Sequence, residues 1–166
     1  MDRPTEPVIP PYAVLRQLGR SSLGPSAQVR RGHDGVVVHQ QQILIEKSQA
    51  AALQTALLGL AERLAALGSA GLPRILAVEP LPNEGLLVAS EWREGEPLPT
   101  WLARASEAAL LDCLAQVAAL LYVTATAGLN HLGLTPRKIL VEQAAGGPPR
   151  VSVLDVGKLA CLPTPL

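Results

Sequence analysis

The sequence lacks phenylalanine altogether and has two tryptophans and two tyrosines, so aromatic residues make up 2% of its 166 residues. Apolar residues nevertheless reach 48%, which excludes global disorder and means that leucine, valine and alanine must fill the core. The chain also lacks an excess of either charge, because 14 basic residues balance 14 acidic ones. Proteins that bind nucleic acid usually carry a basic excess, so we expect no nucleic-acid partner.

Cysteine is scarce as well. Two residues, Cys113 and Cys161, exclude a disulfide framework and a zinc cluster. Cys113 lies in an apolar run with helical spacing, where we expect a buried thiol. With neither a ligand cluster nor an intact dinucleotide-binding glycine motif after a strand, we expect no cofactor.

Long hydrophobic runs are absent except for the uncharged stretch 113–136, which contains Gln116, Asn130 and His131 and is therefore not expected to span a membrane. The first residues hold acids and prolines in place of a secretory signal, so we expect a cytoplasmic protein. Arginine outnumbers lysine by 11 to 3, a bias typical of GC-rich bacterial genomes.

Short apolar stretches broken by glycine, serine and proline predict five strands, at 12–18, 26–31, 35–45, 74–79 and 85–91, after a flexible segment over 1–11. A helix over 48–67 is expected between the third and fourth strands. Ser48 is its predicted N-cap, Gly68 ends it, and leucines recur at 53, 57, 60, 64 and 67. Such a stripe favours packing on the protein's own sheet, with a seam to a partner helix as the alternative.

The second half of the sequence predicts mainly helix. A short helix is expected around Thr100, followed by a long helix that opens at Ser106 and closes at Gly128. Its expected buried face consists of Leu110, Leu114, Val117 and Leu121. Two strands at 139–141 and 151–154 then form a hairpin, so the fold class is α+β.

Four motifs, in order, resemble those of protein kinases. The opening YAVLRQLGRSSLG is similar to the kinase glycine-rich loop, with Gly19, Ser21 and Gly24 at its three glycine positions. The stretch LLVASEWREG is similar to the kinase hinge, with Glu91 at its acidic position. Both motifs belong to the nucleotide-binding part of that family, so the resemblance implies that Gly19, Ser21, Gly24 and Glu91 are candidate nucleotide contacts, with vestigial positions as the alternative.

Two further motifs extend the resemblance to residues 12–160. The stretch GLNHLGLTPRKILV is similar to the catalytic loop, with His131 at its histidine position, and VLDVGKLA is similar to the metal-binding D-F-G segment, with Asp155 as its aspartate. The resemblance implies a kinase-like fold: a five-stranded antiparallel small lobe with one helix over 12–95, and a helical large lobe over 96–166 that is truncated just after the D-F-G-like segment.

Several catalytic positions of the family are changed. Gly133 stands where the catalytic loop has its aspartate base, and a glycine can neither accept a proton nor orient a hydroxyl. Lys138 stands where an asparagine holds the second magnesium ion, and a cation there repels metal. The third strand offers His39 or Gln40 in place of the phosphate-binding lysine. We therefore expect no enzyme activity.

Two motif residues keep their family identity. Asp155 is a candidate metal ligand, and the alternative is that it caps the following turn or pairs with a nearby backbone N–H. His131 is expected to pack and form hydrogen bonds rather than act as a base. The apolar residues Leu132 and Val156 are expected to fill the former active site.

The resemblance thus predicts an inactive kinase-like module, a pseudokinase, that acts as a protein-binding regulator or scaffold. Its expected partner is a kinase, a component of a signalling or secretion complex, or a second copy. The candidate contact faces are the leucine stripe at 53–67 and the apolar surface left where further large-lobe helices would pack. One alternative is an unusual nucleotide sensor or residual phosphotransferase using Asp155, Lys138 or Lys47. Another is a structural subunit of a larger assembly.

Overall fold

The computed structural model describes residues 12–81, 85–145 and 147–163, and these form an α+β fold with two antiparallel sheets. The larger sheet is antiparallel and has five strands, as the sequence predicted, and their order is β1-β2-β3-β5-β4. Its strands are β1 (Tyr12–Ser21), β2 (Gly24–Arg31), β3 (Val37–Ile43), β4 (Ile75–Pro80) and β5 (Leu86–Glu91). The predicted flexible segment 1–11 lies outside the described residues.

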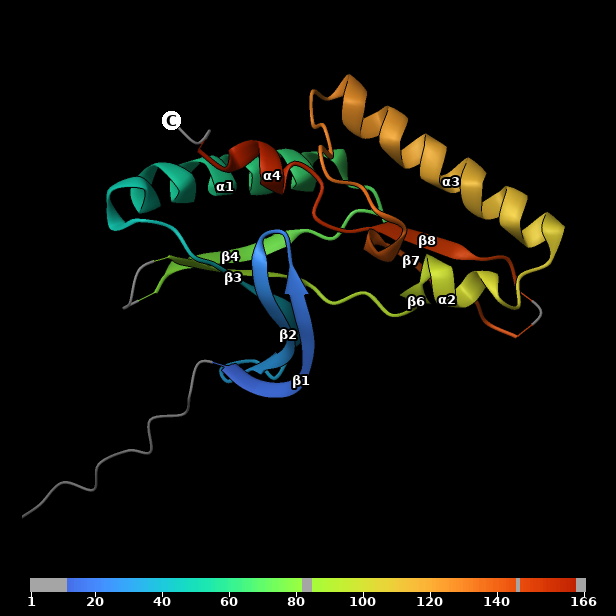
Figure 1. Cartoon of the computed structure of the whole chain (residues 1–166), viewed down its shortest axis with the longest axis horizontal. Helices are drawn as coiled ribbons and strands as arrows, with labels where there is room; N and C mark the ends of the chain where they lie inside the picture. The colour runs from blue at the N-terminus through green and yellow to red at the C-terminus, as the bar shows by residue number, and fades with distance from the viewer. Residues whose placement is uncertain (1–11, 82–84, 146, 164–166) are drawn as a thin grey trace, which may run out of the picture.

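Helix α1 (Lys47–Leu67) lies across one side of this sheet and packs against β4 (Figure 1). Four leucines of its predicted stripe are 0–3% exposed, at positions 53, 57, 60 and 64. Packing on the protein's own sheet is therefore confirmed, and the prediction that this stripe is a contact face for a partner is wrong. Burial there removes apolar surface from water, which is the largest favourable contribution to folding.

The two ends of α1 differ from each other in how well they were predicted. Gly68 ends the helix in the left-handed region, at φ 58°, as expected of a glycine after the last turn. Ser48 is not the N-cap, however. The helix begins one residue earlier, and Glu46 occupies the capping position without a side-chain hydrogen bond.

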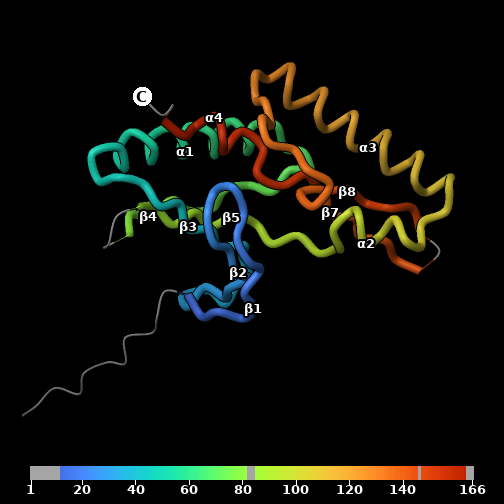
Figure 2. The backbone as a smooth tube through the Cα atoms, viewed as in Figure 1, coloured from blue at the N-terminus to red at the C-terminus, as the bar shows by residue number. Residues whose placement is uncertain are grey.

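The second half of the chain builds the smaller sheet and the remaining helices (Figure 2). The sheet has the order β6-β7-β8, and its outer strand β6 was not predicted. The elements are β6 (Glu96–Pro97), α2 (Leu98–Leu102), α3 (Glu107–Thr126), a 3₁₀ turn (Pro136–Lys138), β7 (Ile139–Glu142), β8 (Arg150–Val153) and α4 (Lys158–Cys161).

Helix α3 begins where the sequence predicted, since the Ser106 hydroxyl accepts a hydrogen bond from the Ala109 backbone N–H at 3.2 Å. Its predicted buried face is only partly right, because Leu114 is 48% exposed. The face on β8 is set by Gln116, whose side chain donates to the Pro149 carbonyl at 2.7 Å and accepts from the Val151 N–H at 3.1 Å. Gln116 thus lies on the side of the helix that faces β8, and the buried residues of the helix are Cys113, Val117 and Thr124.

One hydrophobic core joins the two sheets. It includes the α1 leucines, Val153 of β8 and Trp101 of α2, which is fully buried. The backbone also links the two halves, because the Val153 N–H donates to the Gly71 carbonyl at 2.9 Å. The segment that follows β8 lies next to β3, where Lys158 contacts Gln41. The candidate site lies at this contact.

Candidate functional site

The turn between β1 and β2 is closed onto the sheet. The Ser21 hydroxyl accepts a hydrogen bond from the Leu23 N–H at 3.2 Å and donates to the Gly24 carbonyl at 3.3 Å. Leu23, at the tip of the turn, is 5% exposed and belongs to the main core. Gly24 has φ 139°, and a Cβ added to it would lie 2.0 Å from the Gln42 carbonyl oxygen. Only glycine therefore allows the turn to approach β3 this closely.

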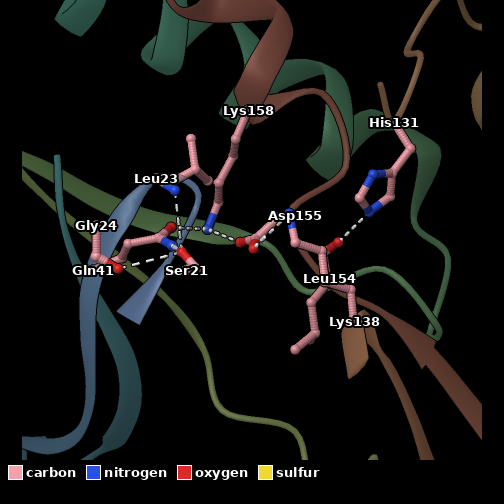
Figure 3. A network of polar contacts seen from close by, with 9 residues as sticks. All are labelled: Ser21, Leu23, Gly24, Gln41, His131, Lys138, Leu154, Asp155 and Lys158. Carbon is pink, nitrogen blue, oxygen red and sulfur yellow. Dashed lines mark hydrogen bonds and ion pairs between the residues drawn. The ribbon is translucent and has the colours of Figure 1, made fainter. Parts of the chain in front are cut away.

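A polar chain runs from this turn to the segment after β8 (Figure 3). Gln41 of β3, which is 1% exposed, donates to the Ser21 hydroxyl at 2.9 Å. Its carbonyl oxygen accepts from the Lys158 ammonium at 3.3 Å, and the same ammonium donates to Asp155 at 3.0 Å. Residues from both ends of the described chain are thus connected through buried polar groups. We call Ser21, Gln41, Asp155, Lys158 and Lys138 the buried polar cluster.

Asp155 lies at the centre of the cluster between two lysines. One carboxylate oxygen is 3.0 Å from Lys158 Nζ and the other is 3.6 Å from Lys138 Nζ. The exposed fractions of the Asp155, Lys158 and Lys138 side chains are 6%, 4% and 11%. Burial alone would raise the pKa of Asp155, but the charge and hydrogen bond of Lys158, with the charge of Lys138, hold it below its usual value.

The carboxylate therefore pairs with ammonium groups instead of capping the following turn. The turn-capping alternative for Asp155 is wrong, because α4 has Gly157 at its N-cap and no side-chain cap. Asp155 itself has φ 60°, a left-handed conformation that is strained for a residue with a side chain. Two ammonium groups around one carboxylate leave an excess of positive charge, which opposes the binding of a metal ion.

Gly133 borders the same cluster. A Cβ added to it would lie 2.3 Å from the Leu159 side chain and 3.9 Å from Lys138 Nζ. The structure thus brings Gly133, Lys138 and Asp155, which come from two separate motifs, close together. A carboxylate cannot replace the glycine without displacing Leu159, so the space that a catalytic base would need is filled.

His131 is 7% exposed, and its Nε2 atom lies 2.6 Å from the Leu154 carbonyl oxygen. This hydrogen bond ties the loop after α3 to the end of β8, directly before Asp155. The contact is structural, because it holds the backbone that presents the carboxylate. Leu132, the next residue, is 70% exposed with φ 45°, so the expectation that it fills the site is wrong, whereas Val156 is 3% exposed in the core.

A cavity of about 20 Å³ lies beside the cluster and is lined in part by His39, Ser90, Glu91, Asp155 and Lys158. This volume holds about one water molecule, whereas ligand pockets measure about 300–1,000 Å³. Burial first, and then the Lys158 charge, lower the pKa of His39 to about 4, so its imidazole is neutral near pH 7. The cavity as it stands does not admit a nucleotide.

The remaining predicted nucleotide contacts lie outside the cluster. Gly19 is on an exposed stretch of β1, at φ 94°, with no atom within 4 Å of an added Cβ. Glu91 ends β5, where it accepts hydrogen bonds from Arg74 at 2.6 Å and Arg93 at 2.7 Å. Although burial acts to raise the pKa of Glu91, these two guanidinium groups lower it. A Cβ on Gly19 would therefore contact no residue of the buried polar cluster, and the carboxylate of Glu91 is occupied by two arginines.

Sequence reasoning did not assign Lys158, Gln41 or Leu23 to the site. The signal for Gln41 was the polar run HQQQ inside a strand of the sheet, because a polar side chain on the core side of a strand needs a partner. The signal for Lys158 was its position three residues after Asp155, on the same side of one turn. Neither pattern predicts that Gln41 and Lys158 contact each other.

Comparison with known proteins adds no assignment, because no family model matches the chain and no curated protein matches it significantly. Within 12–81, 85–145 and 147–163, no three histidine, cysteine, aspartate or glutamate side chains are placed to hold a metal ion. Both cysteines are free thiols.

Proposed function

We propose that this chain is a kinase-like module without phosphotransferase activity, a pseudokinase, which acts by binding another protein. The observation that carries the proposal is the buried polar cluster. The Lys158 ammonium occupies the space beside Asp155 that a nucleotide-bound cation would need.

The arrangement of elements supports the kinase-like part of the proposal. The resemblance implies a five-stranded antiparallel sheet with one helix, and α1 lies between β3 and β4 of such a sheet. Two of the motif residues also lie close together, because Ser21 of the glycine-rich turn is joined to Asp155 of the D-F-G-like segment through Gln41 and Lys158.

The chemistry of the site supports the inactive part. Phosphoryl transfer depends on positioned cations that neutralise the phosphates and on a residue that orients the attacking hydroxyl. Gly133 supplies no such residue, and Leu159 fills the space beside it. Asp155 is already neutralised by Lys158 and Lys138, and Leu23 closes the turn above them.

The proposal is tested by thermal unfolding of the full chain with millimolar ATP, with and without Mg²⁺. A ligand present at 100 times its dissociation constant stabilises a folded protein by about 2.7 kcal/mol. We expect no shift in the melting temperature and no transfer of radiolabelled phosphate to the chain or to a generic protein substrate. A shift with ATP that Asp155→Asn abolishes would contradict the proposal and favour the nucleotide sensor.

A matched variant sharpens this test. Lys158→Ala removes the ammonium from beside Asp155, and Lys47→Ala removes an exposed lysine at the start of α1. If the wild-type chain binds ATP and only Lys158→Ala loses binding, Lys158 is a phosphate ligand and the proposal fails. If neither the wild type nor either variant responds to ATP, the proposal stands.

A further inference from the structure

Helix α3 carries a second apolar stripe on the face that points away from β8. Its members recur at alternating spacings of three and four residues and are all exposed: Ala108, Leu111, Ala115, Ala118, Tyr122 and Ala125. We call these six residues the outer stripe. Leu111 is 62% exposed and Tyr122 is 72% exposed, although both are large side chains. Figure 1 shows α3 lying along the outside of the molecule beside β8.

The spacing of the outer stripe indicates that the partner surface is another helix. A 3-4-3-4 repeat of apolar residues is the seam by which one helix packs along another helix. On α1 the corresponding repeat is buried in the core. On α3 the repeat is exposed instead. A second copy of the chain carries the same repeat on its own α3, so it has a helix that matches this one.

We propose that two copies of this chain associate through their α3 helices, packed antiparallel about a two-fold axis near the midpoint of the outer stripe. In this arrangement Leu111 of each copy faces Tyr122 of the other, and Ala115 faces Ala118. Large side chains then meet at both ends of the seam, while alanines at its centre let the two helices approach closely. A two-fold interface requires this self-complementarity.

The charges around α3 favour the antiparallel orientation. Its first two turns carry Glu107 and Asp112, and the stretch from Cys113 to Thr126 carries no charged side chain. At its other end, the Arg63 guanidinium of α1 donates to the Ala127 carbonyl at 2.6 Å. Parallel packing would place Glu107 and Asp112 of the two copies next to each other, whereas antiparallel packing puts these acidic ends at opposite ends of the seam.

The area is sufficient for a specific complex. A helix of 20 residues is about 30 Å long, and half of its side has an accessible area of about 600 Å². Two copies together bury about 1,200 Å², which reaches the lower end of the range for stable interfaces. A membrane is the less suitable cover, although α1 and α3 are both long and apolar enough to span one by length and composition. Glu107 and Asp112 would be repelled by an anionic lipid surface.

The first test is the mass of the full chain in solution between about 2 and 200 µM, a range of about two orders of magnitude around common affinities, measured by light scattering after size exclusion. We expect twice the 17.4 kDa of one chain. Leu111→Glu and Ala118→Glu each introduce a charge into the outer stripe and should give the mass of one chain. Leu58→Glu, at a leucine that is 46% exposed on α1, is the matched control and should remain dimeric.

The second test fixes the orientation by disulfide cross-linking in a Cys161→Ser background. The double variant Leu111→Cys/Tyr122→Cys should form a covalent dimer on mild oxidation, and neither single variant should. Covalent dimers from a single variant indicate parallel packing and overturn the proposal. So does a chain that stays monomeric at every concentration, or one that floats with phosphatidylcholine and phosphatidylserine vesicles.

This inference rests on the proposed function in one respect: it names the partner of the protein-binding module. The two fail separately. A monomer without a response to ATP overturns the dimer and leaves the proposed function standing, whereas a dimer that transfers phosphate does the reverse.

Discussion

Lys158 acts as an internal counter-ion for Asp155. Two charged groups buried together are stabilised relative to one buried alone, because a lone charge keeps its full desolvation cost without a compensating partner. Lys138 by itself is a poor substitute, since its Nζ atom lies 3.6 Å from the carboxylate and has no hydrogen-bond partner among the described residues. The 3.0 Å contact of Lys158 therefore provides most of the compensation.

Replacing this lysine tests the point. Lys158→Met keeps the length of the side chain and removes its charge, so Asp155 and Gln41 both lose a hydrogen-bond donor. We expect the free energy of unfolding to fall by about 3–5 kcal/mol, measured by urea denaturation at pH 7. Lys47→Met, at an exposed position, should change it by less than about 0.5 kcal/mol. Equal effects of the two variants would contradict the role of Lys158.

His39 makes the stability of the fold depend on pH. In the unfolded chain its imidazole titrates near 6.5, whereas burial and the Lys158 charge lower its pKa in the folded chain to about 4. Between these values the unfolded state binds a proton that the folded state does not. The contribution of His39 to the free energy of unfolding is therefore fully present above pH 6.5. It is lost as the pH falls towards 4, by up to about 3 kcal/mol.

The comparison of wild type with His39→Gln isolates this effect. We expect the variant to lose less stability between pH 6.5 and pH 4, as measured by urea denaturation at half-unit intervals. Carboxyls such as Asp155, whose pKa is lowered on folding, also lose their contribution to stability as the pH nears 4, but both proteins contain them, so the difference between the two profiles reports His39. Identical pH profiles for the two proteins would show that His39 is not the titrating group.

Among the elements, the β1–β2 hairpin and α1 each contain a glycine with a distinct role. Gly24→Ala places a methyl group 2.0 Å from the Gln42 carbonyl at φ 139°, so we expect a loss of about 2 kcal/mol in the free energy of unfolding. Gly59 lies inside α1 with no atom within 4 Å of an added Cβ. Gly59→Ala should therefore raise stability by about 0.5–1 kcal/mol. Urea denaturation measures both, and changes of the same sign would contradict this distinction.

The elements themselves were largely predictable from the sequence. The strands and α1 follow from apolar periodicity and glycine positions, which are local properties of the chain. The inward face of α3 was not predictable, because the helix has two apolar stripes and spacing alone does not say which one meets the core. Gln116 decides between them through two bonds to the segment before and at the start of β8, and such partners are not visible in the sequence.

The residues of the candidate site also differ in how far the sequence indicates them. His131, Gly133 and Asp155 were singled out from short motifs, since each motif lies within a few residues. Gln41 and Lys158 are separated by 117 positions, and their contact depends on how both sheets fold. Local patterns contain no information about that pairing.

The molecule as a whole separates a closed polar centre from an open apolar surface. The centre, around Asp155, is filled by side chains of the chain itself. The surface, on α3, leaves large side chains such as Leu111 and Tyr122 in contact with water. The proposed protein-binding function requires apolar side chains on the outside of the molecule, and α3 exposes Leu111 and Tyr122 there.

The distance in sequence between Gln41 and Lys158 also has a consequence for biosynthesis. A ribosome adds roughly 5–20 residues per second, so the lysine emerges on the order of ten seconds after the glutamine. During that interval β1, β2 and β3 are already outside the ribosome, but the cation that joins their turn to Asp155 has not been made. The nascent hairpin can therefore gain this contact only after synthesis has passed Lys158, when α4 forms.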